Sequence, residues 1–374
     1  MKTLRVLHSL NELRPSGAEV MLRSAAAQWK EHGVEADVLA VAPDIGPFAT
    51  DLRAAGYHVA HEENAPWWLV PFRFRRRVRA GRYDVVHLHD ETLNFWLALA
   101  AYSAGARVVS TVHNVFPLGG KARAKRVVQR AILRVMGTVH VAVSEDVANN
   151  ERRRFRNPAR VVDNWYDPAF APPTPEERAR ARAALGLGEH DVVAVSVGNC
   201  STVKRHDAVL AAMAHRACPP ELVYLHLGQE DEAREEHRLA VRLGLADRVR
   251  FLGARHPLEA LHAADVYAMP STHEGMSIAA VEALATGLPA VFADAPGLRC
   301  LAEASPAAVL TDVAPAALAR ALARAAARPA AERGQQAAAP VQRRFGMARG
   351  VAEHVEIYRR LLKPGRNSEA HRTT

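Results

Sequence analysis

The sequence is poor in cysteine, with only Cys200, Cys218 and Cys300 among its 374 residues. These three residues form no closely spaced pair, which excludes a disulfide-rich framework and a cysteine-based metal site. Such a sparse set is typical of a reducing compartment, so we expect a cytoplasmic protein. Long apolar runs are also missing, and without about 18 consecutive apolar residues no transmembrane helix is expected. The first apolar run is too short for a signal peptide and predicts a strand instead.

Common nucleotide-binding and metal-binding motifs are absent as well. No Gly-x-Gly-x-x-Gly turn follows the apolar runs at 6–8 or 194–197, and no P-loop occurs, which excludes dinucleotide-dependent dehydrogenases and P-loop NTPases. The sequence also lacks an Asp-x-Asp pair, so we expect neither a metal nor a cofactor. Aromatic residues make up only 6% of the chain and no nucleic-acid module is found. Nucleic acid is therefore not an expected partner.

What the chain does contain is a regular alternation of short β-branched runs and helical patterns. Strands are predicted at 5–9, 35–41, 58–61, 85–88, 108–112, 139–144 and 160–162, and again at 192–197, 222–227, 249–252, 266–269, 290–293 and 308–310. Helices are predicted at 17–32, 48–55, 93–104, 121–136 and 145–153, and then at 205–214, 231–243, 257–263, 277–286, 297–303 and 314–327. This alternation predicts an α/β fold with parallel, doubly wound sheets.

A chain of this length is expected to form two domains, and the proline-rich stretch at 165–176 predicts the linker between them. We place an N-terminal domain at 1–165 and a second domain at 166–350, two similar Rossmann-like units facing each other across a cleft. A C-terminal helix at 351–363 is expected to return to the N-terminal domain, and the polar tail at 364–374 is expected to be disordered. Ligands of such sheets bind beyond the carboxyl ends of the strands.

Positive charge is concentrated in the first half of the chain. Residues 1–165 hold 24 Lys and Arg against 16 Asp and Glu, a net charge of +8, whereas 166–374 hold 25 against 24. The densest basic segments are 72–79 and 121–136. In the second segment Val127, Val128, Ala131, Ile132 and Val135 line one side of the predicted helix, while Lys125, Arg126, Arg130 and Arg134 point elsewhere. Both segments are compatible with a solvated face and with docking on an anionic membrane, where each basic residue is worth about 1 kcal/mol.

The most informative segment is 274–289, in which Glu274 and Glu282 lie eight residues apart on a predicted short helix. That helix is expected to end at Gly287 and Pro289. Glu274 and Gly275 precede the helical run, so free backbone N–H groups there can face an anion. A site of this kind can hold a diphosphate on the helix N-terminus and sugar hydroxyls on the carboxylates, which indicates a nucleotide-sugar.

Other short segments accompany this one in a fixed order along the chain, at 16–19, 85–89, 111–114, 143–145, 197–204 and 270–277. Together with 274–289 they resemble glycosyltransferase family 4, the retaining enzymes of GT-B fold, over roughly residues 3–362. The resemblance implies an acceptor-binding N-terminal domain and a C-terminal domain that binds the nucleotide-sugar. The sparse cysteines and the basic first half predict a location in the cytoplasm or, peripherally, at the inner face of the plasma membrane.

The resemblance implies roles for individual residues. Glu274 would bind donor-sugar hydroxyls, Glu282 the ribose hydroxyls, and Lys204 the diphosphate as it leaves. His113 would face the donor sugar, and Gly17 would let donor or acceptor approach the backbone. The remaining expected donor-binding residues are Gly198, Asn199, Gly275, Met276 and Ser277.

The sequence departs from the family pattern at three places. Asn199 stands where the family usually has arginine, so neutralisation of the diphosphate falls more heavily on Lys204. Met276 and Ser277 replace the usual Phe-Gly step, and Ser277 can cap the following helix while crowding the donor pocket. The segment 164–167 replaces the usual hinge sequence, so a different hinge geometry is expected.

The resulting prediction is a metal-independent, retaining glycosyltransferase. It would transfer a sugar from a UDP-sugar to a glycan or lipid-linked acceptor in bacterial envelope or exopolysaccharide synthesis. Two alternatives remain open: a UDP-sugar 2-epimerase of the same fold, and a non-catalytic glycan-binding protein, for which Asn199 is the best support.

Overall fold

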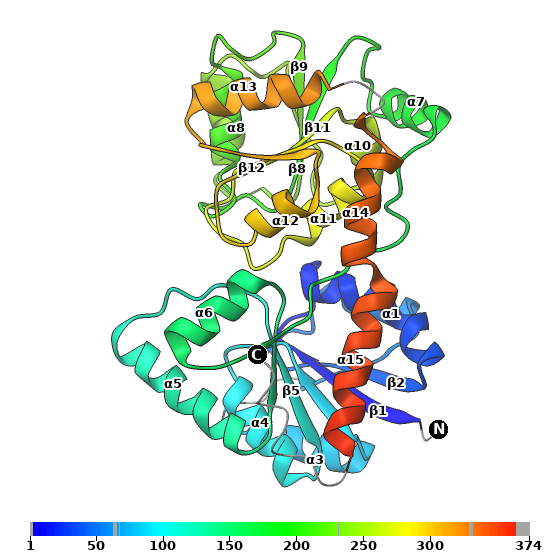
Figure 1. The fold of residues 1–374 in the computed structure, drawn as a ribbon, viewed down its shortest axis with the longest axis vertical. Coiled ribbons are helices and arrows are strands. Elements are labelled where there is room, and N and C mark those ends of the chain that lie inside the picture. The colour runs from blue at the N-terminus through cyan, green and yellow to red at the C-terminus, as the bar shows by residue number, and fades with distance from the viewer. Residues whose placement is uncertain (1–2, 63–65, 67, 231, 329–331, 364–374) are drawn as a thin grey trace. The chain divides into compact units, whose positions relative to one another are not determined.

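The computed structural model describes residues 3–62, 66, 68–230, 232–328 and 332–363. The chain forms two compact units: unit 1 comprises Met1–Asn164 and Met347–Thr374, and unit 2 comprises Trp165–Gly346 (Figure 1). The second boundary falls before Met347 instead of after residue 350, because the last helix begins there. The predicted tail at 364–374 lies outside the described residues. None of the described helices combines the length and apolarity needed to cross a membrane.

Unit 1 is built on a seven-stranded parallel sheet with the order β3-β2-β1-β4-β5-β6-β7. Its strands are β1 (Leu4–Leu10), β2 (Val34–Ala40), β3 (His58–His61), β4 (Val85–Leu88), β5 (Arg107–Val112), β6 (Val139–Ala142) and β7 (Arg160–Val161). Its helices are α1 (Gly17–Glu31), α2 (Ala49–Ala54), α3 (Val70–Gly81), α4 (Asn94–Ser103), α5 (Gly120–Val135), α6 (Glu145–Phe155) and α15 (Met347–Leu362). The chain winds outward in both directions from the neighbouring strands β1 and β4, which makes that junction the topological switch point.

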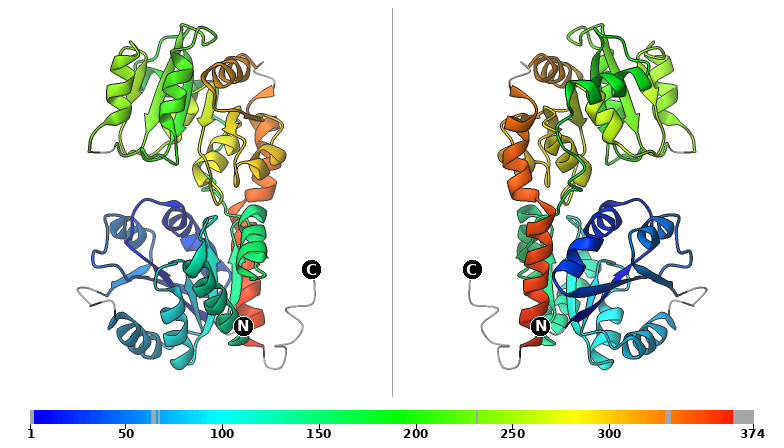
Figure 2. Two further views of the ribbon diagram at one scale, coloured as in Figure 1. Left: turned by 90° about the vertical axis from the view of Figure 1, so that its left-hand side faces the viewer. Right: turned by 90° about the vertical axis from the view of Figure 1, so that its right-hand side faces the viewer.

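The last helix, α15, belongs to unit 1 although it is almost 200 residues from the rest of it in sequence. It packs against α1 and the β5 strand (Figure 2). The Tyr358 hydroxyl on α15 is 2.6 Å from His87 Nδ1 on β4, and Arg349 Nη2 donates to the Asp163 carbonyl at 2.8 Å. These contacts tie both ends of unit 1 together.

Unit 2 contains a six-stranded parallel sheet with the order β10-β9-β8-β11-β12-β13. Its strands are β8 (Val192–Val197), β9 (Leu222–Leu227), β10 (Val249–Phe251), β11 (Val266–Met269), β12 (Ala290–Ala293) and β13 (Ala308–Thr311). Its helices are α7 (Pro175–Ala184), α8 (His206–Met213), α9 (Glu235–Arg242), α10 (Leu258–Ala263), α11 (Ile278–Ala285), α12 (Arg299–Ala304), α13 (Pro315–Ala326) and α14 (Gln335–Phe345). Here the switch point lies between β8 and β11.

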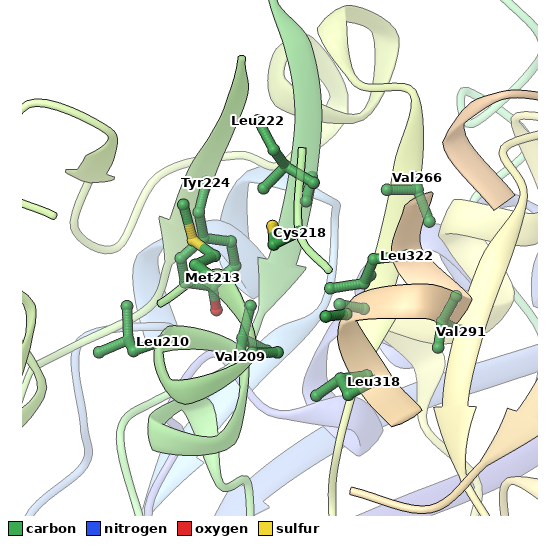
Figure 3. Close-up of a cluster of buried hydrophobic side chains, with 14 of the residues drawn as sticks. Val209, Leu210, Met213, Cys218, Leu222, Tyr224, Val266, Val291, Leu318 and Leu322 are labelled. Carbon is green, nitrogen blue, oxygen red and sulfur yellow. The ribbon is translucent and has the colours of Figure 1, made fainter. Parts of the chain in front are cut away.

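The apolar core of unit 2 explains why its strands read as continuous hydrophobic runs. Leu222 and Tyr224 of β9 and Val266 of β11 meet side chains of α8 and α13 such as Val209 and Leu322 (Figure 3). All five are completely buried. A parallel sheet covered on both faces needs apolar side chains on both sides of each strand, which is the pattern that the sequence shows.

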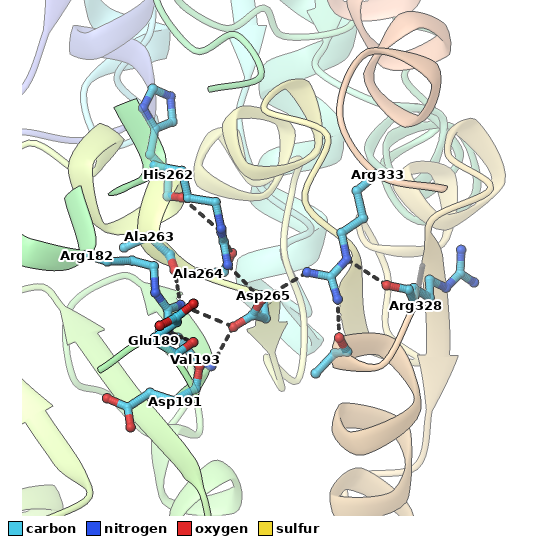
Figure 4. A network of polar contacts seen from close by, with 12 residues as sticks. Arg182, Glu189, Asp191, Val193, His262, Ala263, Ala264, Asp265, Arg328 and Arg333 are labelled. Atoms are coloured by element: carbon cyan, nitrogen blue, oxygen red, sulfur yellow. Dashed lines mark hydrogen bonds and ion pairs between the residues drawn. The ribbon is translucent and has the colours of Figure 1, made fainter. Parts of the chain in front are cut away.

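A partly buried carboxylate holds α7 on unit 2. Asp265 accepts hydrogen bonds from Arg178 Nη2 at 2.8 Å, from Arg333 Nη1 at 3.0 Å and from the Val193 backbone N–H at 2.9 Å (Figure 4). Arg182 adds an ion pair at 3.6 Å. Three guanidinium groups around one carboxylate compensate the cost of burying its charge, and they fix the segment that follows the proline-rich linker.

Most predicted elements are present, but three helices were not predicted. In α3 the basic residues hide an apolar stripe of Val70, Phe74 and Val78, all of them buried. In α7, Thr174 and Glu177 form a capping box that starts the helix. In α14, Pro340 lies inside the helix, where proline is not expected. The α9 helix begins at Glu235, later than the predicted residue 231.

The orientation of α5 differs from that of a core-facing amphipathic helix. Its buried side chains include Arg130, which is 3% exposed, whereas Val128, Ile132 and Val135 of the apolar side are 58%, 41% and 87% exposed. Arg130 points inward because Glu91 and Glu151 each bind its guanidinium at 3.1 Å. Val128, Ile132 and Val135 are therefore left exposed on the surface of α5.

Candidate functional site in each unit

In unit 2 the predicted residues gather at the switch point between β8 and β11. The loop 198–205 follows β8 and the loop 270–277 follows β11, so both lie at the carboxyl edge of the sheet, where ligands of such sheets bind. The Thr272 N–H donates to the Val203 carbonyl at 2.9 Å, which joins the two loops.

Lys204 and Glu274 contact each other at this junction. The Lys204 ammonium donates to Glu274 Oε1 at 2.8 Å, and the two side chains are 25% and 12% exposed. The sequence predicted a role for each residue but not that they form a pair. The pair brings a cation and a carboxylate to the same point of the sheet edge, with enough exposure for a ligand to reach both.

Close backbone packing shapes the loop that carries Lys204. A Cβ on Gly198 would lie 3.2 Å from Lys204 Cε, and a Cβ on Gly228 would lie 2.1 Å from the Gly198 carbonyl oxygen. The Asn199 Oδ1 accepts the Gln229 N–H at 2.9 Å. Asn199 therefore links this loop to the loop after β9.

The segment carrying Glu274 packs closely against Gly297. That glycine has a φ of +78°, and a Cβ there would lie 2.3 Å from the Glu274 carbonyl oxygen and 2.8 Å from that of Gly275. The Glu274 N–H donates to the Pro296 carbonyl at 3.0 Å. Only glycine fits this approach, so residue 297 helps to set the position of Glu274.

The α11 helix starts immediately after this segment. Ser277 is its N-cap, and its Oγ accepts the Ala280 N–H at 3.4 Å, as predicted from the sequence. Met276 and Glu282 are buried, with 6% and 5% exposure. The carboxylates of Glu274 and Glu282 both add to the effect of burial in raising the pKa of the Tyr267 hydroxyl, so both act on the same buried position of β11.

In unit 1, Gly17 and His113 follow β1 and β5 at the carboxyl edge of the sheet. Gly17 is exposed and is the first residue of α1. Nearby in the first turn, Glu19 is buried, and burial raises its pKa to about 7 although the Ser16 hydroxyl donates to it. A carboxyl group with such a pKa at a switch point is a candidate functional group that the sequence reasoning missed.

His113 is linked to two further histidines that were not predicted as site residues. Its Nε2 is 3.0 Å from His89 Nδ1, and His89 Nε2 is 3.0 Å from His8 Nδ1. Burial lowers the pKa of His113 to about 4 and that of His8 to about 3. For His89, the signal in the sequence was the His-x-His pair at 87–89, at the end of a strand. That pair contributed to the family resemblance but was not assigned a role.

Comparisons with known proteins concern the family and the fold of the chain. Residues 15–170 match the family described as Glycosyltransferase Family 4, and residues 177–339 match the family described as Glycosyl transferases group 1. The D-inositol 3-phosphate glycosyltransferase of Salinispora tropica is 30% identical over 356 residues, covering 82% of this chain and 72% of the relative. The EpsF protein of Bacillus subtilis is 28% identical over 315 residues, covering 78% and 79%.

Among solved structures, Anabaena HepE in complex with UDP and glucose superimposes with a TM-score of 0.81 at 21% identity, covering 95% of this chain and 99% of that one. At this identity the likeness concerns the fold. The two matching family segments, the relative at 30% identity and the two parallel-sheet units lead to one conclusion: the chain belongs to glycosyltransferase family 4 and is a glycosyltransferase of GT-B fold.

Proposed function

We propose that this glycosyltransferase takes its sugar from a nucleotide-diphosphate sugar, with UDP as the nucleotide, and retains the anomeric configuration. The observation that carries the proposal is the Lys204–Glu274 pair, held 2.8 Å apart at the unit 2 switch point beside the N-terminus of α11. HepE, which shares the fold, was solved with UDP and with UDP-glucose, and this supports the choice of nucleotide.

The pair has a simple use in this reaction. A diphosphate would bind the Lys204 ammonium in place of Glu274. It would also face the N-terminus of α11 at Gly275, Met276 and Ser277. Glu274 would then be free to accept hydrogen bonds from the sugar hydroxyls. Glu282, one helical turn past the cap, would accept those of the ribose. Lysine and helix N-terminus together supply the positive charge that the leaving group needs, so the proposal requires no metal.

The sugar would be transferred by attack of the acceptor hydroxyl on the same face that the diphosphate leaves, with a diphosphate oxygen taking the acceptor's proton. The protein would contribute position and electrostatics. His113 would orient the sugar, and exposed Gly17 would let a substrate approach the first turn of α1.

Replacement of either member of the pair tests the proposal. We expect Glu274→Gln and Lys204→Met each to lower kcat by about 10²- to 10³-fold, the range for loss of one transition-state contact. Glu259→Gln, on an exposed position of α10, is the matched control and should retain activity. A folded Glu274→Gln variant with unchanged transfer would overturn the assignment. Isomerisation of the donor without acceptor would favour an epimerase, and donor binding without nucleotide release would favour a glycan-binding protein.

For the acceptor we propose a glycan or a lipid-linked glycan of the cell envelope. The surface of unit 1 supports a membrane location. The large apolar side chains that unit 1 exposes, among its described residues, lie on or beside three helices that pack together, α3, α4 and α5. They are Trp68, Phe72, Trp96, Val128, Ile132, Val135 and Met136.

Exposed basic residues lie on two of the same helices. Exposed positions include Arg75, Arg76 and Arg79 on α3 and Lys121 and Lys125 on α5. Apolar anchors among cations are the pattern of a helix that lies in an anionic lipid surface. The proposed partner of this face is therefore the inner leaflet of the plasma membrane.

Vesicle co-sedimentation tests the membrane partner. We expect binding to anionic vesicles at low salt that is weakened by the double variant Ile132→Ser, Val135→Ser. The control is Val241→Ser on α9 of unit 2, which removes a side chain of similar exposure, 57%. Equal binding by all variants would refute the membrane proposal. Transfer to soluble inositol phosphate in place of a lipid-linked glycan would assign this chain the acceptor named for its relatives from Geodermatophilus obscurus and Salinispora tropica.

A further inference from the structure

Three imidazoles form a hydrogen-bonded chain across the unit 1 switch point. His8 lies on β1, His89 follows β4 and His113 follows β5. The two links, His8 Nδ1 to His89 Nε2 and His89 Nδ1 to His113 Nε2, are both 3.0 Å long. His89 therefore uses both of its ring nitrogens within the chain, and His113 uses its Nε2.

The links restrict where the protons are. A neutral imidazole carries one N–H and one bare nitrogen, so each link needs a donor on one side and an acceptor on the other. If His8 Nδ1 donates to His89 Nε2, then the proton of His89 is on Nδ1 and donates to His113 Nε2. The proton of His113 is then on Nδ1. The opposite direction would place all three protons on Nε2.

The buried end of the chain selects between these two directions. His8 Nε2 is buried and has no hydrogen-bond partner among the described residues, and the His8 side chain is 1% exposed. The opposite direction would leave an N–H orphaned at this position, and orphaned buried N–H groups are rarer than under-satisfied acceptors. We therefore take His8 Nε2 to be bare and the chain to run from His8 towards His113.

The surroundings keep the three imidazoles of His8, His89 and His113 neutral. Burial is the main cause that lowers the pKa of each of the three imidazoles, and a proton on His354 would lower them further. His87 stacks on His89 at 4.2 Å between ring centroids. No protonated member would find a counter-charge in the contacts described for these rings, so the directional hydrogen-bond pattern persists at neutral pH.

A metal ion is the competing reading of the same cluster, because nitrogens of His8, His87 and His89 lie within 4.8 Å of one another. However, His87 already uses both nitrogens: Nδ1 is 2.6 Å from the Tyr358 hydroxyl and Nε2 is 2.6 Å from Thr111 Oγ1. Ligation would cost it one of these short bonds, whereas the hydrogen-bonded chain uses the nitrogens as they lie.

We propose that His8 and His89 are positioning residues that fix His113 in the tautomer with its proton on Nδ1, so that this nitrogen donates a hydrogen bond to the donor sugar. The proposal rests on the proposed role of His113 in binding that sugar. It assigns a direction to the contact: the partner on the sugar is an oxygen acting as an acceptor.

The first test is spectroscopic and needs no substrate. Long-range 1H–15N spectra of the protein labelled at histidine report which ring nitrogen carries the proton. We expect His113 to show the Nδ1–H form, although free histidine prefers Nε2–H. In His89→Phe the His113 signals should shift towards the Nε2–H form. His89→Leu, which also removes both ring nitrogens, covers the case in which the phenylalanine variant does not fold, and the same shift is expected in it.

The second test is kinetic. We expect His89→Phe to lower kcat by about tenfold to a hundredfold with little change in the KM for donor, the size of effect that misplacement of a contact produces. His8→Phe should act in the same direction and less strongly. His140→Phe is the matched control: His140 is a buried histidine of β6, 3% exposed, without a hydrogen bond to either ring nitrogen among the described residues. It should leave kcat unchanged.

The outcomes separate this inference from the proposed function. A His113 signal in the Nε2–H form in the wild-type protein, or one unaffected in His89→Phe, overturns the inference whatever the enzyme transfers. Stoichiometric Zn²⁺ binding that His8→Phe abolishes would overturn it too, in favour of a metal site. A fixed Nδ1–H tautomer together with full transfer by His113→Ala would instead overturn the proposed role of His113.

Discussion

Acidification should destabilise unit 1 before it protonates most carboxylates. The perturbation is a change from about pH 7.5 to about pH 5, and it acts through histidines that folding buries in the neutral form. Burial lowers the pKa of His8 to about 3 and that of His354 to about 4, from 6.5 in the unfolded chain. Their side chains are 1% and 5% exposed, so solvent screens them little.

The sign follows from these shifts. Below pH 6.5 these two histidines bind protons in the unfolded state but stay neutral in the folded state. The stability of the folded state is therefore fully present above the unfolded pKa and is lost as the pH falls towards the folded pKa. Each group costs about 1.4 kcal/mol per pH unit, or about 2 kcal/mol by pH 5. The two together remove about 4 kcal/mol, a large part of the about 5–15 kcal/mol that stabilises a typical domain. His87 and His89, whose pKa values are lowered as well, add to the loss.

Hydrogen exchange of the β1 and β4 amides measures this loss, because their exchange requires the sheet of unit 1 to open. After correction for the intrinsic rate, we expect the opening free energy to fall by about 4 kcal/mol or more between about pH 7.5 and about pH 5. His354→Asn should reduce the slope by about one proton, since the amide can keep the bond to the Gly350 carbonyl. His58→Asn, at an exposed site on β3, should leave the slope unchanged. An opening free energy independent of pH over this range would refute the reasoning.

Three further predictions concern single side chains. The raised pKa of Glu19, about 7, makes folding less favourable as pH rises from 4.5, so Glu19→Gln should be more stable than the wild type by about 3 kcal/mol at pH 8 and equal at pH 4, which urea titration measures. Gly297→Ala should displace the Glu274 carbonyl and lower transfer sharply, whereas Gly137→Ala, with φ +94° and nothing within 4 Å, should cost only about 1 kcal/mol of strain and leave transfer unchanged. Arg130→Met should destabilise unit 1 by about 3–5 kcal/mol in urea titration, because two carboxylates then lose their buried partner, and a loss below about 1 kcal/mol would contradict the inward role of this arginine.

Local patterns were enough to predict most of the secondary structure and the family. The β-branched runs predicted the strands because a parallel sheet buries both faces of each strand, and Ser277 could be assigned as a helix cap from its position alone. Where the prediction of a helix failed, the local sequence pattern did not indicate it. In α3 the arginines outnumber the three apolar residues that pack inward, and in α7 Arg178 contacts Asp265, which is 87 residues away in sequence.

The sequence by itself determined the alternating α/β architecture, the family and the identity of candidate residues such as Lys204, Glu274 and His113, because periodicity and motif spacing are local properties. Only the tertiary structure decided which of them meet. Lys204 and Glu274 are 70 residues apart and His8 and His89 are 81 apart. Each pair meets because its two strands are neighbours at a switch point, and that adjacency depends on strand order, which no local pattern encodes. The same holds for Arg130, whose inward direction depends on two distant carboxylates.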